Sequence, residues 1–135
     1  MTPEIKREVQ DSWSKVVPIA DIAGKLFYTN LFEADPSLKP LFKGNIEEQS
    51  AKLTAMITAA VSRLDNLDIL VPILVSLGKR HAGYGVKPEH YEIVGAALLK
   101  TLEQGLGERF TEETQHAWTV VYGVIAEVMI GTDKN

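Results

Sequence analysis

Hydrophobic positions recur at intervals of three and four residues along nearly the whole chain. This spacing places side chains on one face of an α-helix. It is clearest over residues 46–64, where neither glycine nor proline intervenes, and over residues 111–128. No stretch alternates strictly between polar and apolar residues, as a half-buried strand would. The pattern therefore predicts an all-α protein.

Proline and glycine divide this pattern into seven predicted helical segments. Proline is best tolerated in the first turn of a helix, and glycine relieves strain at its end. Pro3, Pro18, Pro36 and Pro88 therefore open segments, whereas Gly44-Asn45 marks a turn. We expect one domain over residues 1–135, because no repeat or low-complexity linker interrupts the series. The predicted segments run from Pro3 to Val17, from Pro18 to the stop at Asp35-Pro36, from Pro36 to Phe42, from Ile46 to about Leu64, from the break at Asp65-Asn66 to Gly83, from Pro88 to the stop at Gly105, and from the cap at Thr111 through Val128.

The composition is that of an ordinary globular protein and excludes several kinds of site. Hydrophobic residues make up 45% of the 135 residues and charged residues 24%. The absence of cysteine excludes disulfides, iron–sulfur clusters, zinc-thiolate sites, a thiol nucleophile and thioether attachment of haem. Any metal or cofactor chemistry must therefore use other ligands.

Charge and hydropathy narrow the expected partners. The formal net charge of −4 provides no basic field for nucleic acid. The longest run without Asp, Glu, Lys or Arg, residues 114–126, is too short to span a membrane. The first residues, Met-Thr-Pro-Glu, do not resemble a secretory signal. We expect a cytoplasmic protein that binds neither nucleic acid nor membrane.

One histidine stands out among the candidates for chemistry. His81 ends an apolar stripe formed by Leu70, Leu74 and Leu77. A lone histidine on an apolar face is more often a core residue than a ligand, but a neutral imidazole in an apolar slot is also what a haem iron requires. The preceding Lys79 and Arg80 suit either a solvated helix end or contacts with haem propionates. His81, His90 and His116 do not form the helical zinc motif, and no phosphate-binding glycine loop is present.

Short fragments typical of one protein family occur in a fixed order along nearly the whole chain. They are LFYTNLF at 26–32, PLF at 40–42, QSAKL at 49–53, RH at 80–81, KPEHYEIVG at 87–95, AW at 117–118 and YGVIA at 122–126. Each fragment alone is weak, but their order and separations are specific. Together they resemble the bacterial single-domain globins and the haem domain of flavohaemoglobins. The seven predicted helices agree with a globin fold packed around a haem pocket.

The resemblance assigns roles to individual residues. It implies that haem b is held noncovalently, with His81 as the proximal iron ligand and Phe42 packed on the haem face. Tyr28 and Gln49 match the distal tyrosine and glutamine. The remaining residues expected to contact the cofactor are Leu53, Leu77, Arg80, Val86, Tyr91 and Val94.

The proximal side departs from the flavohaemoglobin pattern. Tyr91 matches a tyrosine that acts there with a glutamate to strengthen the hydrogen bond on the proximal histidine. The glutamate position falls on Asn135, and Asp133 lies about 200° away round a helix. Asp133 could therefore replace the glutamate only if this segment leaves helical geometry.

The implied function is reversible, high-affinity binding of dioxygen for storage or scavenging. If the Tyr28 hydroxyl and the Gln49 carboxamide each contribute roughly 1–2 kcal/mol, together they slow oxygen release by about ten- to a thousand-fold. Whether either side chain coordinates ferric iron directly stays open. One alternative is nitric oxide dioxygenation with a separate reductase, and another is a cofactor-free interaction or sensor domain. We expect a monomer or a weak homodimer.

Overall fold

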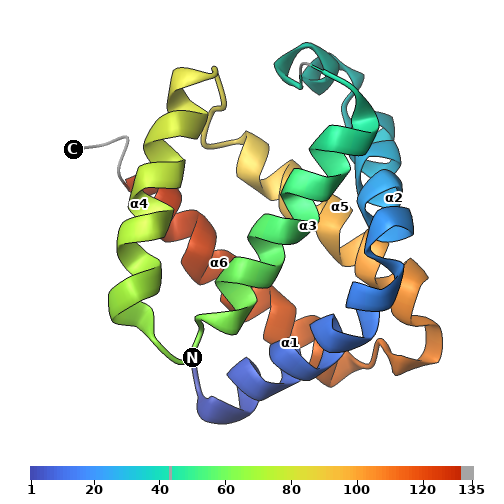
Figure 1. Ribbon diagram of the computed structural model, residues 1–135, viewed down its shortest axis with the longest axis vertical. Coiled ribbons are helices and arrows are strands. Elements are labelled where there is room, and N and C mark those ends of the chain that lie inside the picture. Colours follow the sequence, from blue (N-terminus) through green and yellow to red (C-terminus); the bar gives the residue numbers. More distant parts are fainter. Residues whose placement is uncertain (43, 132–135) are drawn as a thin grey trace.

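The computed structural model describes residues 1–42 and 44–131, which contain six α-helices, three short 3₁₀-helices and no strand (Figure 1). The all-α prediction is confirmed. The elements in chain order are α1 (Pro3–Val16), η1 (Val17–Ile19), α2 (Ala20–Ala34), η2 (Pro36–Leu41), α3 (Ile46–Ser62), α4 (Leu67–Gly83), α5 (His90–Leu106), η3 (Gly107–Arg109) and α6 (Glu112–Gly131).

Three helices, α1, α3 and α6, are preceded by a Thr or Asn whose side chain caps the first turn. The Oγ1 atom of Thr2 accepts a hydrogen bond from the backbone N–H of Ile5 at 3.2 Å. The Asn45 Oδ1 accepts from the N–H of Glu48 at 2.7 Å. Thr111 likewise accepts from the N–H of the residue three positions later, at 3.2 Å. These caps satisfy backbone donors that have no partner within a helix.

Three segments differ from the expected helices. The second segment was expected to open at Pro18, but Pro18 lies in the short 3₁₀-helix η1, and α2 begins two residues later at Ala20. The short third segment is the 3₁₀-helix η2, in which the N–H of Phe42 bonds to the carbonyl of Lys39. Pro40 lies within it and has no N–H to donate, which disfavours a regular α-helix. The sixth segment begins at His90 rather than Pro88, because the N–H groups of His90 and Tyr91 make three-residue turn bonds that precede the helix.

The helices pack around one apolar core. α2 crosses α3 and α5, α1 lies on α6, and α4 also packs on α6. The α2–α3 crossing is close, since a Cβ on Gly24 would lie 2.7 Å from that of Ser50. The rings of Trp13 and Trp118 meet edge to face at 5.9 Å between α1 and α6. No described helix is long and apolar enough to cross a membrane.

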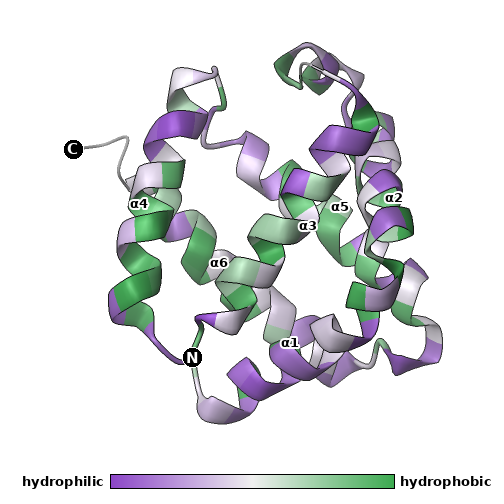
Figure 2. Cartoon of the chain, in the orientation of Figure 1, coloured by the Kyte–Doolittle hydropathy of each residue, from purple (hydrophilic) through white to green (hydrophobic). Residues whose placement is uncertain are grey.

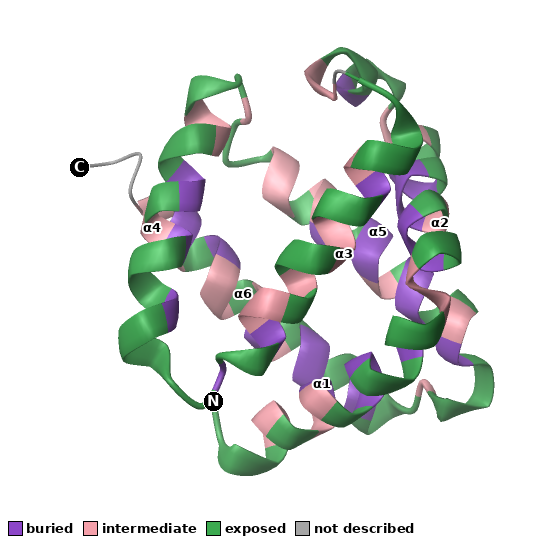
Figure 3. Ribbon diagram, viewed as in Figure 1, coloured by how far each residue is buried: buried purple, intermediate pink, exposed green. Residues whose placement is uncertain are grey.

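α3 and α4 pack against different helices. α3 lies on α2 and α1, whereas α4 lies on α6 (Figure 1). Half-buried residues lie on α3, α5 and α6 along the region between α3 and α4 (Figure 3). A cavity of about 140 Å³ separates the C-terminal half of α3 from the N-terminal half of α4. The space between these two helices is thus bordered by incompletely covered side chains.

Candidate functional site

His81 lies in the last turn of α4, and a backbone hydrogen bond fixes its ring. Its Nδ1 is 2.9 Å from the carbonyl oxygen of Leu77, one turn earlier. A carbonyl can only accept, so Nδ1 carries the proton and donates it. In the neutral ring the lone pair then lies on Nε2, the atom that faces away from this bond. The structure therefore presents a half-buried imidazole with Nε2 as its available donor atom.

The surroundings of His81 favour its neutral form. Burial lowers the pKa of the imidazole below its ordinary value, and the positive charge of Arg80 lowers it further. The hydrogen bond to Leu77 acts in the opposite direction but is smaller than the burial effect. At neutral pH the ring is uncharged, as a metal ligand must be.

The backbone after His81 folds back over the end of α4. The carbonyl of His81 accepts hydrogen bonds from the N–H groups of Tyr84 and Val86, both at 3.0 Å. Gly85 supports this turn with a φ of 93°, which is a conformation that favours glycine. Val86 is half-buried beside His81, and Leu77 is buried. The exposed Arg80 lies about 100° round the helix from His81.

The first turns of α5 bring Tyr91 and Val94, both half-buried, to the same end of the molecule as the end of α4 (Figure 1). The hydroxyl of Tyr122 in α6 donates to the backbone carbonyl of Tyr91 at 2.7 Å. Sequence reasoning did not identify this anchor. Its signal was Gly95 in the interior of a helix, where a Cβ would lie 2.7 Å from the Tyr122 ring.

A cluster of aromatic rings forms on the opposite side, between α2 and the segment before α3. Tyr28 is 4% exposed, and its ring centroid lies 5.1 Å from that of Phe27 and 5.3 Å from that of Phe42. Phe32 contacts both Tyr28 and Phe42. The structure therefore brings Tyr28 and Phe42 together.

The phenol of Tyr28 remains a hydrogen-bond donor at all ordinary pH values. Burial raises the pKa of Tyr28 to about 12. Its hydroxyl is 3.4 Å from the backbone carbonyl of Gln49, which is long for an O–H···O bond. Tyr28 and the half-buried Gln49, in the first turns of α3, are therefore close neighbours. The weak bond leaves the hydroxyl able to turn toward a better acceptor.

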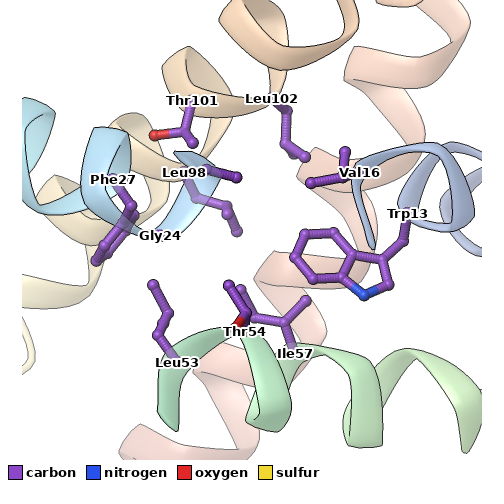
Figure 4. A pocket seen from close by; sticks show the side chains of 11 residues that line it. Trp13, Val16, Gly24, Phe27, Leu53, Thr54, Ile57, Leu98, Thr101 and Leu102 are labelled. Atoms are coloured by element: carbon purple, nitrogen blue, oxygen red, sulfur yellow. The ribbon is translucent and has the colours of Figure 1, made fainter. Parts of the chain in front are cut away.

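Leu53 lies one turn after Gln49 and points into the interior between α2, α3 and α5 (Figure 4). There it borders a cavity of about 10 Å³ together with Phe27, Ile57 and Leu98. The lining of this cavity is almost entirely apolar (Figure 4), and the cavity has room for about one water molecule. Leu53 therefore packs the core behind Tyr28 and Gln49.

No group of three or more His, Asp or Glu side chains capable of holding a metal ion occurs in residues 1–42 and 44–131. The expected glutamate position at Asn135 and its possible substitute Asp133 lie outside these described residues. The sequence-predicted residues thus lie in two regions of the fold. One comprises the last turns of α4, the following turn and the first turns of α5, and the other comprises the adjoining parts of α2, η2 and α3.

Comparisons with known proteins agree on one family. The sequence profile of the family described as "Globin" matches residues 25–129. The chain is 35% identical over 112 residues to a flavohemoprotein of Bacillus subtilis, covering 81% of this chain and 28% of that protein. It is 32% identical to a neuroglobin of Danio rerio, covering 94% of this chain and 89% of the relative. The chain spans about a third of the length of the flavohemoproteins it matches.

The fold has a close counterpart among solved structures. A structure described as a hexacoordinated heme protein from an anhydrobiotic tardigrade superimposes with a TM-score of 0.90. The match covers 100% of this chain and 96% of that one, at 22% sequence identity. This likeness extends over all the helices described above.

Proposed function

Because this chain belongs to the globin family, whose cofactor is haem, we propose that it binds dioxygen reversibly at a noncovalently held haem b. In this proposal His81 is the proximal ligand, and Tyr28 with Gln49 forms the distal side. When bound, haem supplies an iron atom with a coordination position for a diatomic ligand.

The observation that carries this proposal is the 2.9 Å contact between the His81 Nδ1 and the Leu77 carbonyl. It sets the tautomer, because it leaves the unprotonated nitrogen of the neutral ring available for iron. It also holds the ring orientation, since a second hydrogen bond on a ligating histidine fixes the ring about its axis. His116, by contrast, is exposed on α6.

The side chains around His81 and Tyr28 fit a flat apolar cofactor. Phe42, Tyr91 and Val94 are half-buried although they pack against the core, so each retains apolar surface that the protein does not cover. Burying such surface against a porphyrin is favourable at roughly 25 cal/mol per Å². With no cysteine in the chain, this contact and His81 would supply the attachment.

Two hydrogen-bond donors support the proposed distal side. The Tyr28 hydroxyl keeps its proton, because burial raises its pKa to about 12, and its present acceptor is distant. The Gln49 side chain, on the neighbouring helix α3, carries an NH₂ group that can also donate. Hydrogen bonds from both groups in an apolar site would slow the release of dioxygen.

The proximal assignment is tested with His81→Gly. We expect the purified variant to lose most of its haem and its Soret band, and free imidazole to restore both by occupying the vacated space. His116→Gly is the matched control, and its spectrum should equal that of the wild type. A normal spectrum for His81→Gly would refute the assignment.

The distal assignment is tested by stopped-flow measurement of oxygen dissociation. Tyr28→Phe and Gln49→Ala should each accelerate release by about five- to thirty-fold, which corresponds to roughly 1–2 kcal/mol per hydrogen bond. Lys52→Ala, an exposed change on the same helix as Gln49, is the control. Unchanged rates in both distal variants would contradict the assignment.

A second candidate function is oxidation of nitric oxide to nitrate with the help of a separate reductase. The observation that favours it is the 35% identity to a flavohemoprotein. The oxygen supplies two atoms to nitrate, and the reductase returns the iron to its ferrous state by one electron. The test mixes the oxygenated protein with nitric oxide and then adds reductase and NADH. Sustained nitrate formation supports this function, and a single turnover without recovery contradicts it.

A further inference from the structure

A methionine and an arginine line the cavity of about 140 Å³ between α3 and α4. Apart from Arg63, the lining side chains are apolar, and both helices are largely hydrophobic along this stretch (Figure 2). A cavity of this size has room for a molecule of a few atoms, because one water occupies about 30 Å³ of the liquid. Met56 is 38% exposed, so a small solute can reach its side chain from solvent.

The cavity adjoins the candidate site on both helices. Met56 lies seven residues after Gln49, and at about 100° per residue the two positions differ by only about 20° round α3. Arg63 follows Met56 after seven more residues and lies on the same line. On α4, Leu77 lines the cavity, and its backbone carbonyl holds the ring of His81. Met56 is therefore on the side of α3 that carries Gln49, opposite the helix that carries His81.

We propose that Met56 is a site of reversible oxidation by hydrogen peroxide and that Arg63 assists the reaction. The sulfur lone pair attacks one oxygen of the peroxide, the O–O bond breaks, and hydroxide leaves. The hydroxide then takes the proton from the oxygen that is now bound to sulfur. The products are methionine sulfoxide and water, so the sulfur loses two electrons and the peroxide gains them. Methionine sulfoxide is returned to methionine by dedicated reductases.

Arg63 supplies the hydrogen-bond donors that this reaction needs. Its Nη1 donates to the carbonyl oxygen of Ala59 at 2.9 Å, which directs the guanidinium back along α3 toward Met56. A guanidinium has five N–H donors and keeps its charge, so donors remain for the leaving hydroxide. The sulfoxide oxygen also requires a donor, because burying an unpaired polar atom among apolar side chains is unfavourable. Arg63 therefore favours both the reaction and its product.

The other two methionines of the chain separate this proposal from simple exposure. Met129 is 6% exposed, whereas Met1 is 38% exposed, the same fraction as Met56, and does not line the cavity. Exposure alone predicts equal oxidation of Met1 and Met56. The proposal predicts that Met56 is oxidised faster than Met1 and that Met129 is oxidised slowest. It does not depend on the proposed function, because hydrogen peroxide is added as the oxidant.

The test treats the full chain with hydrogen peroxide and follows sulfoxide formation at each methionine by peptide mass spectrometry. Ile22→Met supplies an internal reference, since Ile22 is 60% exposed on α2 and does not line the cavity. Although it is less exposed, Met56 should be oxidised about three- to fivefold faster than the introduced methionine. Methionine sulfoxide reductases should then restore its original mass. Oxidation of Met56 at an equal or lower rate overturns the proposal.

The same measurement is made with and without haem. The haem-loaded chain carries carbon monoxide on the iron, so that peroxide does not react there, and the haem-free chain is treated in parallel. A chain that takes up no haem refutes the proposed function, whereas the rate at Met56 tests the present proposal in either form.

Substitutions of Arg63 test its part in the reaction. Arg63→Leu keeps aliphatic volume but removes the donors, and it should slow oxidation of Met56 about fivefold, which corresponds to one hydrogen bond of roughly 1 kcal/mol. Arg63→Lys retains a charged donor and should keep most of the rate. Arg7→Leu, an exposed change on α1, is the control. Circular dichroism confirms that each variant is folded. An unchanged rate at Met56 in Arg63→Leu overturns the role of Arg63.

Discussion

Replacing Gly78 by alanine should destabilise the protein, although alanine is the better helix former. A Cβ added at Gly78 would lie 2.5 Å from the carbonyl oxygen of Met129 in α6 and 2.8 Å from its Cα. Ordinary contacts of a Cβ are 3.4–4 Å, so α4 and α6 would have to separate. Both obstructing atoms belong to the backbone and cannot turn away. Forcing such a shift costs typically about 1–3 kcal/mol.

A matched substitution isolates that cost. Gly123 lies within α6, and a Cβ added there would meet nothing within 4 Å. Both Gly78→Ala and Gly123→Ala gain roughly 1 kcal/mol of helix propensity. The difference between their free energies of unfolding is therefore the cost of the contact at Gly78, about 1–3 kcal/mol.

Urea unfolding of the apoprotein, followed by circular dichroism at 222 nm, measures the two free energies. We expect Gly123→Ala to have a higher free energy of unfolding than the wild type. The free energy of unfolding of Gly78→Ala should be lower than that of Gly123→Ala by about 1–3 kcal/mol. Haem should also dissociate faster from Gly78→Ala, because His81 lies one turn further along the displaced helix. Equal stabilisation by both substitutions would refute the close α4–α6 contact.

Three further predictions concern single side chains. Tyr28 should ionise near pH 12, so a tyrosine titration at 295 nm should lose that component in Tyr28→Phe. Because its folded pKa is raised, Tyr28 contributes stability below about pH 10 that declines as pH rises toward 12. Ser12→Ala removes the acceptor 2.8 Å from the Trp118 Nε1 and should cost about 1–3 kcal/mol in thermal unfolding. Asn45→Ala removes the cap of α3 and should cost about 1 kcal/mol in the same measurement, whereas Asn66→Ala, at a helix start without a side-chain cap bond, should cost less.

Most of the helices could be predicted from the sequence, because periodic apolar residues and the positions of proline and glycine act locally. Thr111 and Asn45 cap helices where the sequence places them. The exceptions have local causes that periodicity does not report. Pro40 removes a donor and tightens its segment to a 3₁₀-helix, and the turn at Pro88 delays α5 by two residues.

For the candidate site, the sequence could predict on which side of a helix a residue lies, but not its hydrogen bonds or tertiary contacts. The stripe ending at His81 placed it on the buried side of α4, but spacing carries no information about which ring nitrogen bonds to Leu77. The hydrogen bond from Tyr122 to Tyr91 joins residues 31 positions apart and therefore depends on the tertiary packing. Similarly, a helix that is apolar on several sides does not reveal that Ile69 and Ile73 are the exposed residues.

The bond between His81 and Leu77 has a consequence for tolerance to mutation. Its acceptor is a backbone carbonyl, which every amino acid possesses. Any substitution at Leu77 that preserves the helix keeps the acceptor in place, and only a break in α4 would remove it. The tautomer of His81 is thus determined by the backbone of the helix and not by a neighbouring side chain. Genetic drift can alter the apolar walls around His81 while its proton stays on the same nitrogen.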